Sequence, residues 1–474
     1  MSCPFHFTTA FHCVTTILLW ASLTGVAPTA LAQPADLTPR GEEAWRFETL
    51  TLSDGRKFVG FVQQITEYEV EFAQVFRTPG KPMSATVRVI PPHDVDLLEQ
   101  LPPDVRYTML QRFRAFKHRA AIEAGSMMEL TLTARLLDGQ RWWRYEGRWF
   151  ALDSSADERA TRRCIVRIEQ MFRAYRQLLP PRMHPTERLK IVLHGSLDEY
   201  HTALRAMGLD IANLAFYAPR DDLIVAGAEL STYAQELAKI RGVHQSELIQ
   251  IQRDYDDFRS RLLRLSEQLA EREFSPEQIR EETTLRTAAW NREHESLLRK
   301  IRETNRRNAK KFDEVTSRMF RRLYHEAFHA YLDRFVLAPD QPPVDRWFNE
   351  GLAQVFEAGQ LDGDTLRIDA PNPKALQQLQ RDLASDSPLT LTQLLAANDR
   401  DFLLSHNNGA SQRHYLYAWG LAYYLTIEEG MLQDGKLALY LTAHDKASLQ
   451  RLEELTGKPL AELEREWRRA MLRM

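Results

Sequence analysis

Cysteine is scarce in this chain, with only Cys3, Cys13 and Cys164 among its 474 residues. A disulfide framework is excluded, because the first two lie in a segment that we expect to be removed and one remaining thiol cannot form an internal bridge. Cys164 lies on an apolar helical stripe, where we expect a small core residue rather than a nucleophile. The sequence therefore gives no support to a cysteine peptidase.

Surplus positive charge is also missing, since 62 Lys and Arg are balanced by 65 Asp and Glu, for a net charge of −3. A protein that neutralises nucleic-acid phosphates needs such a surplus, so we expect no nucleic acid among the partners. The composition, 44% hydrophobic and 27% charged, is that of a globular protein. The length predicts two or three structural units rather than one core.

A long apolar run is absent as well. The stretch at residues 13–27 is too short to span a bilayer comfortably, and Ala30-Leu31-Ala32 follows it as a small-x-small cleavage pattern. We therefore expect residues 1–32 to be a signal peptide cleaved after Ala32, and the mature chain to be periplasmic or extracellular. The preceding segment holds no Lys or Arg, unlike most signal peptides, so an uncleaved membrane anchor is the alternative.

The most informative motif that is present is His325-Glu326-Ala327-Phe328-His329, an H-E-x-x-H pattern. Positions i and i+4 share one face of a helix, so both imidazoles can reach a single metal ion. The surrounding residues 318–335 contain no Pro or Gly and carry apolar residues at helical spacing, which predicts a helix ending near Pro339. The alternative is a pair of helical His side chains without a metal.

A third ligand is available downstream in Trp347-Phe348-Asn349-Glu350-Gly351, which we expect to be helical. A catalytic zinc ion takes three protein ligands and keeps one position for water, and His, His and Glu form a known set. The pattern predicts a Zn²⁺ site made by His325, His329 and Glu350. Glu326 is then the expected general base for the attacking water.

At these residues the chain resembles the gluzincin metallopeptidases, the thermolysin-like group with H-E-x-x-H and a downstream Glu ligand. More narrowly, it is similar to the bacterial peptidase MA-like proteins, many of them exported. The resemblance covers residues 128–474 apart from one long insertion, and it implies the same ligands and base. Many thermolysin-type enzymes use an Asp four residues after the Glu ligand to orient a His, whereas this chain has Gln354. Asp333 lies on the zinc face of its helix and is our candidate for that role.

The resemblance also implies a Tyr or His near the metal, supplied by the C-terminal half, that stabilises the oxyanion of the attacked carbonyl. The candidates are His414, Tyr415 and Tyr417, and Tyr417 is favoured because it matches the family's Tyr-x-x-Trp-like pattern. The alternative for such aromatic residues beside an apolar helix is core packing. The Gly-x-Met-Glu-Asn segment of the related aminopeptidases is absent.

We expect an α+β fold with a thermolysin-like catalytic domain over residues 128–474, which combines a mixed sheet and a helical half. Alternating short runs around the turn Asp54-Gly55 predict a small β-barrel or a curled sheet over residues 41–103. We expect this unit either to recognise a partner or to pack on the larger domain. In the gluzincins an edge strand binds the substrate backbone as an added strand, and we expect this strand within residues 213–227.

Residues 230–316 predict an antiparallel helical hairpin inserted before the zinc helix. Its first helix carries a heptad seam. At the start of the second helix, Ser275 and Gln278 form a capping box and Pro276 takes the first helical position. The seam residues are Leu248, Ile251, Tyr255, Phe258, Leu262, Leu265 and Leu269. The hairpin is a lid, a self-association arm or a docking site for another protein, or else a strut that packs only on itself.

These patterns together predict an exported zinc metallopeptidase that acts on peptides or proteins. The second hypothesis is a cell-envelope binding or scaffolding protein with a peptidase-like fold and a structural or vestigial zinc site. Hydrolysis of a non-peptide amide or ester uses the same zinc chemistry and is the third.

Overall fold

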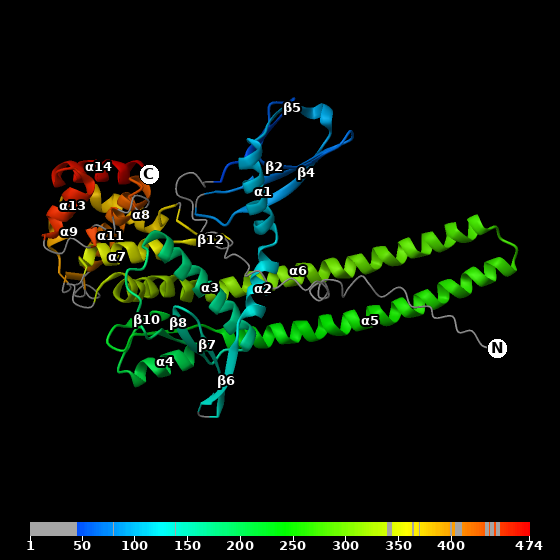
Figure 1. Cartoon of the computed structure of the whole chain (residues 1–474), viewed down its shortest axis with the longest axis horizontal. Helices are drawn as coiled ribbons and strands as arrows, with labels where there is room; N and C mark the ends of the chain where they lie inside the picture. The colour runs from blue at the N-terminus through cyan, green and yellow to red at the C-terminus, as the bar shows by residue number, and fades with distance from the viewer. Residues whose placement is uncertain are drawn as a thin grey trace, which may run out of the picture. The chain divides into compact units, whose positions relative to one another are not determined.

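Our computed structural model describes residues 45–474, apart from residues 79, 138, 339–343, 363, 364, 369, 399, 400, 403–409, 432–435, 437–439 and 442–445. The expected signal peptide, residues 1–32, lies outside the described residues. Residues Arg46–Met474 form one unit that contains two main sheets and many helices, which confirms the predicted mixture of α and β structure (Figure 1). None of the described helices has both the length and the apolar character needed to cross a membrane.

The N-terminal sheet is antiparallel and has the strand order β4-β3-β2-β1-β5. Its strands are β1(Glu48–Leu52), β2(Lys57–Ile65), β3(Val70–Phe76), β4(Ser84–Ile90) and β5(Val95–Glu99). The turn between β1 and β2 contains Gly55 with φ of 86°, a left-handed conformation that favours glycine. A meander of four strands is thus completed by a fifth strand that returns to pair with β1.

Of the two forms predicted for residues 41–103, a small β-barrel or a curled sheet, the closed barrel is wrong, because this sheet is open. A closed barrel requires its first and last strands to pair, but β4 and β5 are the two edges of the sheet in the described structure. Side chains of β4 are exposed along nearly its whole length. Helix α1(Pro103–Lys117) packs on the sheet instead, with the Phe113 ring 5.1 Å from the ring of Phe61.

The second sheet is mixed, as predicted, with the order β10-β11-β9-β8-β7-β6. Its strands are β6(Leu132–Leu137), β7(Gln140–Glu146), β8(Phe150–Ser154), β9(Leu189–His194), β10(Ala215–Ala218) and β11(Leu223–Gly227). Strands β8, β9 and β11 run parallel, and the remaining pairs are antiparallel. Strand β10, at one edge, lies within residues 213–227, where the sequence predicts an edge strand.

Three helices alternate with these strands along the chain. Helix α2(Arg119–Glu129) precedes β6, α3(Glu158–Leu178) connects β8 to β9, and α4(Leu197–Ala206) lies between β9 and β10. Helix α3 begins at Asp157, whose carboxylate accepts hydrogen bonds from the backbone N–H groups of residues 159 and 160. Cys164 on α3 is fully buried, as predicted for a core residue, and burial raises the pKa of its thiol to about 12. A thiol that stays protonated at neutral pH is a poor nucleophile.

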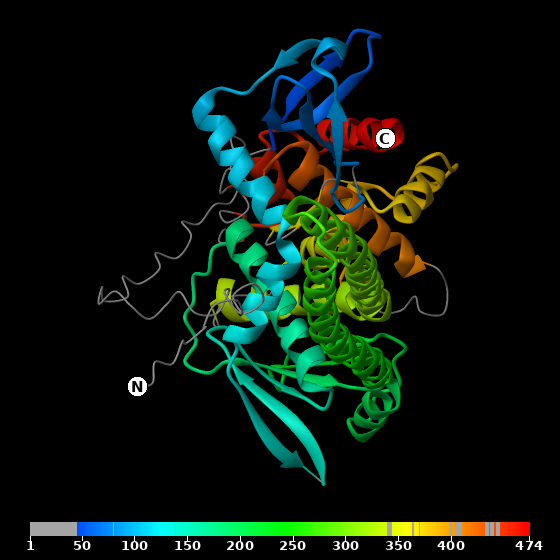
Figure 2. The same ribbon diagram turned by 90° about the vertical axis from the view of Figure 1, so that its right-hand side faces the viewer.

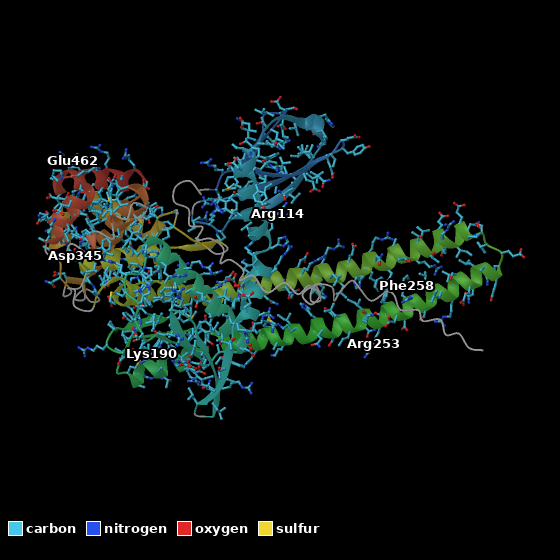
Figure 3. The ribbon with its side chains drawn as sticks, in the orientation of Figure 1. Arg114, Lys190, Arg253, Phe258, Asp345 and Glu462 are labelled. Carbon is cyan, nitrogen blue, oxygen red and sulfur yellow. The ribbon has the colours of Figure 1, made fainter. Side chains whose placement is uncertain are left out.

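Two long antiparallel helices, α5(Leu230–Glu271) and α6(Pro276–Tyr331), lie side by side in both views (Figures 1 and 2). The capping box predicted at the start of α6 is present, with Ser275 and Gln278 each bonding the other's backbone N–H. Figure 3 shows Phe258 on the side of α5 that faces α6, where its ring stacks on Trp290 at 5.6 Å. Because no Pro or Gly lies between Pro276 and Tyr331, α6 continues without a break through the H-E-x-x-H motif.

The C-terminal part is mostly helical, as the sequence predicts. Its elements are the π-helical turns η3(Leu332–Val336) and η5(Tyr424–Glu428), the short strands β12(Gln360–Asp362) and β13(Thr365–Arg367), and helices α7(Arg346–Glu357), α8(Pro373–Leu383), α9(Leu391–Ala396), α11(Ala410–Tyr423), α13(Ser448–Thr456) and α14(Leu460–Arg473). Helices α7 and α11 pack closely because of Gly351, where a Cβ atom would lie 2.4 Å from the carbonyl oxygen of Ala418. This contact fixes the position of Glu350, the neighbour of Gly351.

Candidate metal centre

The H-E-x-x-H motif lies in the last three turns of α6, where the helix enters the core. Leu323, Ala327 and Phe328 have no exposed surface, and the Phe328 ring stacks on Phe356 of α7 at 4.8 Å. These contacts direct the opposite side chains of the same turns towards Glu350. The core packing of α6 on α7 therefore brings two helices with candidate ligands together.

His325, His329 and Glu350 form a cluster in which one possible ligand atom from each lies within 4.8 Å of the others. The Nε2 atoms of His325 and His329 lie 3.3 Å and 3.7 Å from the same oxygen, Oε2 of Glu350. His325 and Glu350 are only 2% and 3% exposed. Two imidazole nitrogens and one carboxylate oxygen that converge at these distances can hold a metal ion. The three ligands predicted from the sequence are thus brought together.

The other nitrogen of each imidazole is also engaged. Nδ1 of His325 donates to Oε2 of Glu357 at 3.1 Å, and Nδ1 of His329 donates to Oδ1 of Asn349 at 2.8 Å. With Nδ1–H used as a donor, the free lone pair of each ring is on Nε2, which faces Glu350. Such outer partners orient metal-binding imidazoles and raise their basicity. Glu357 and Asn349 therefore complete the site.

Sequence reasoning missed both of these partners. Glu357 lies seven residues after Glu350, two helical turns along the same face, and Asn349 is a polar residue in an apolar helix; these were the available signals. The role proposed for Asp333 does not fit: its side chain is exposed, and within the described residues no hydrogen bond joins it to either His. Gln354 donates to the backbone oxygens of Glu350 and Tyr415, so it links α7 to α11.

The protonation states favoured by the cluster suit a metal. Burial disfavours charge on His325, but hydrogen bonds with Glu350 and Glu357 outweigh burial and raise its pKa. Burial, together with the neighbouring His325, lowers the pKa of His329. For Glu350, burial is outweighed by the hydrogen bond with His325 and by nearby positive charge, so its pKa falls to about 2. A metal needs an ionised carboxylate and neutral imidazoles, and only His325 must be deprotonated against its surroundings.

Glu326 lies beside the cluster and is almost fully buried. Its Oε2 accepts a hydrogen bond of 3.1 Å from the backbone N–H of Tyr217, on edge strand β10, and its Oε1 forms an ion pair with Arg322 one turn earlier on α6. Because the Tyr217 N–H points to Glu326, it points away from the neighbouring strand of the sheet. The carboxylate of Glu326 therefore joins the metal cluster to the edge strand β10.

Only one of the three aromatic candidates on α11 lies near the cluster. Tyr415 is close enough to Glu350 for that carboxylate's charge to add to burial in raising its pKa, while a hydrogen bond with Arg346 acts in the opposite direction. Arg346 also forms an ion pair of 2.7 Å with Oε1 of Glu350. Tyr415, Arg346 and Glu350 thus form one connected group.

The selection of Tyr417 does not agree with this geometry. Its hydroxyl donates to Oδ2 of Asp382 at 2.6 Å, and its ring packs on Trp467 at 5.5 Å. Residues two apart on a helix lie about 200° apart, so a helix that turns Tyr415 to the cluster turns Tyr417 away from it. The ring of His414 packs on Phe402 at 5.6 Å. Tyr415 is therefore the candidate that the fold leaves at the site.

Comparison with known proteins adds a family without an assigned activity. Residues 321–448 match the model of DUF1570, a family described as a protein of unknown function. The match covers the H-E-x-x-H motif and Glu350 but less than half of the chain, and it begins inside α6, after the exposed part of that helix. No curated protein and no solved structure matches the chain.

Proposed function

We propose that this chain is an exported, zinc-dependent metallopeptidase of the gluzincin type. The observation that carries the proposal is the convergence of two imidazole Nε2 atoms and one carboxylate oxygen, with both Nδ1 atoms held from behind and Glu326 alongside. This donor set fits a catalytic zinc better than a structural one, because three protein ligands leave a coordination position open. The adjacent carboxylate has no role in holding a metal but suits a general base.

When bound, zinc supplies Lewis acidity towards a carbonyl oxygen and a water molecule. Glu326 accepts the proton of the attacking water and delivers it to the leaving amine. Arg322 and the Tyr217 N–H hold its two oxygens, so the carboxylate has a fixed position beside His325. The hydroxyl of Tyr415 is the group on α11 available to donate to the oxyanion that develops on the carbonyl.

A peptide substrate suits the edge strand β10. An extended peptide that adds to a sheet edge gains main-chain hydrogen bonds independently of its sequence. Because the Tyr217 N–H already reaches Glu326, a peptide along this edge would place a backbone amide beside the base. Peptide bonds, rather than esters or isolated amides, are therefore the substrate class that we favour.

The test is metal content together with turnover in three purified proteins. We expect about one zinc per chain in the wild type and none in His329→Ala, because two ligands do not retain zinc. Glu326→Gln should keep its zinc and lose most cleavage of a peptide mixture, since a neutral amide cannot accept the proton. A zinc-loaded Glu326→Gln variant with normal cleavage, or a folded wild type that never takes up zinc, refutes the proposal.

One observation favours the second hypothesis, a cell-envelope binding protein with a structural metal. Both functional carboxylates have arginine partners, Glu326 with Arg322 and Glu350 with Arg346. A chelator separates the two functions. Loss of cleavage with the fold intact supports the peptidase, whereas unfolding on metal removal, in a protein without cleavage, supports the structural site.

A further inference from the structure

The hairpin is exposed over an unusual length. From residue 234 to residue 311, no side chain of α5 or α6 is buried. The two helices cover one another only along their seam, which includes Phe258 and Trp290 (Figure 3). The outer face of α6, opposite this seam, is therefore free to meet another molecule.

Charge on this outer face differs between the two ends of the exposed part of α6. Glu277 and Glu281 lie near the tip of the hairpin, and Arg299, Arg302 and Arg306 lie on the same face towards its base. All five side chains are exposed, and within the described part of the chain none of them has a hydrogen bond or ion pair. One face of one helix thus has an acidic end and a basic end, with Arg292 and Glu295 exposed between them.

The two ends match when α6 is paired with an antiparallel copy of itself. In antiparallel helices the numbers of facing residues have a constant sum. One register places Glu277 opposite Arg306 of the second copy and Glu281 opposite Arg302 of the second copy. Both pairs are symmetric about the same point, between Asn291 and Arg292. In a two-fold interface each of these pairs occurs twice.

The length of the exposed face agrees with this register. The register sets Pro276, at the tip, opposite Arg307 of the second copy. Phe312 is the first fully buried residue of α6 as the helix enters the core. Each tip therefore stops just before the partner's core, and nearly all of the exposed part of α6 is used.

We infer that two copies of this chain associate through the outer faces of α6, antiparallel about a two-fold axis. Each exposed ion pair contributes little on its own, so the dimer depends on several pairs and weakens with salt. Leu285, which is 60% exposed, lies beside Arg299 of the second copy, whose aliphatic stem covers it. The inference concerns a surface outside the metal centre and does not depend on the proposed function.

The experiment is sedimentation velocity of the full chain over a concentration series at low salt. The wild type should form dimers that dissociate as salt is added. Glu281→Arg and Arg302→Glu should each weaken the dimer at least about tenfold, because each change turns two attractive pairs into two repulsive ones. An equimolar mixture of the two variants should form dimers again, because each pair then joins opposite charges.

A matched control is Arg253→Glu on α5, an exposed residue on the side of that helix away from α6 (Figure 3). It should dimerise like the wild type, and circular dichroism should show that every variant keeps its helix content. A wild type that stays monomeric at low salt overturns the inference and leaves this face to a different partner. Dimers that survive both charge reversals, or variants that fail to pair in the mixture, overturn it as well.

Discussion

The two halves of α6 share one uninterrupted backbone but have opposite surroundings. Between Pro276 and Lys311 no side chain is buried. From Phe312 to Tyr331, by contrast, most side chains that face the sheet and α7 are buried. The exposed half is held by its capping box, the seam with α5 and local pairs such as Glu282 with Arg286. The buried half is held by core packing. The exposed half thus stays helical without burial, whereas the alignment of His325 and His329 depends on core packing.

The largest expected difference is in the free energy of unfolding, when the same Leu→Ala substitution is made in each half of α6. Leu323→Ala, at a fully buried position, should lower the free energy of unfolding by about 2–5 kcal/mol, because it removes apolar contacts and leaves a cavity. Leu285→Ala, at a position 60% exposed, should change it by less than about 0.5 kcal/mol. Chemical denaturation in dilute protein measures both. Equal losses would show that the exposed half is packed in solution.

A smaller effect should separate the two tyrosines of α11. Tyr415→Phe removes the hydroxyl beside Glu350 and, under the proposed function, should lower kcat by about 10²-fold or more with zinc retained. Tyr417→Phe removes the hydrogen bond to Asp382 and should cost about 1 kcal/mol of stability without changing kcat. Turnover and thermal unfolding of both variants give the answer. The reverse pattern would restore Tyr417 as the catalytic donor.

The smallest effect concerns the support behind the ligands. Glu357→Gln keeps the shape of the side chain but weakens its hold on Nδ1 of His325, so zinc affinity should fall about 10- to 100-fold. Competition with a chromophoric chelator measures this change. Glu303→Gln, on the exposed half of α6, is the control and should leave zinc affinity unaltered. Unchanged affinity in Glu357→Gln would show that His325 is oriented by its own packing.

Much of the site is local in sequence and was predictable for that reason. His325 and His329 lie one turn apart, so helix geometry alone places them together, and the apolar residues around Glu350 indicate a buried helix. The start of α6 was predictable because the side chains of Ser275 and Gln278 each bond the other's backbone N–H. Each of these features depends on neighbours within a few residues.

The remaining features depend on how distant elements dock. Which of Tyr415 and Tyr417 meets Glu350 is set by the rotation of α11, which the close contact at Gly351 fixes. The bond from His325 to Glu357 requires the relative position of α6 and α7. The N-terminal sheet stays open because residues 95–99 pair with β1 rather than with β4. None of these choices is encoded in a short segment, so periodicity could not settle them.

The unbroken course of α6 also constrains how chains of this type can vary in length. Each residue added or removed between the outer charged face and His325 turns that face by about 100° relative to the imidazoles. A single deletion would therefore point the hairpin in a different direction, while an insertion of seven residues nearly restores it. A matching insertion in α5 would be needed to keep the seam in register. Hairpins in relatives should accordingly differ by paired, whole-heptad steps, a periodicity that an alignment of such chains would reveal.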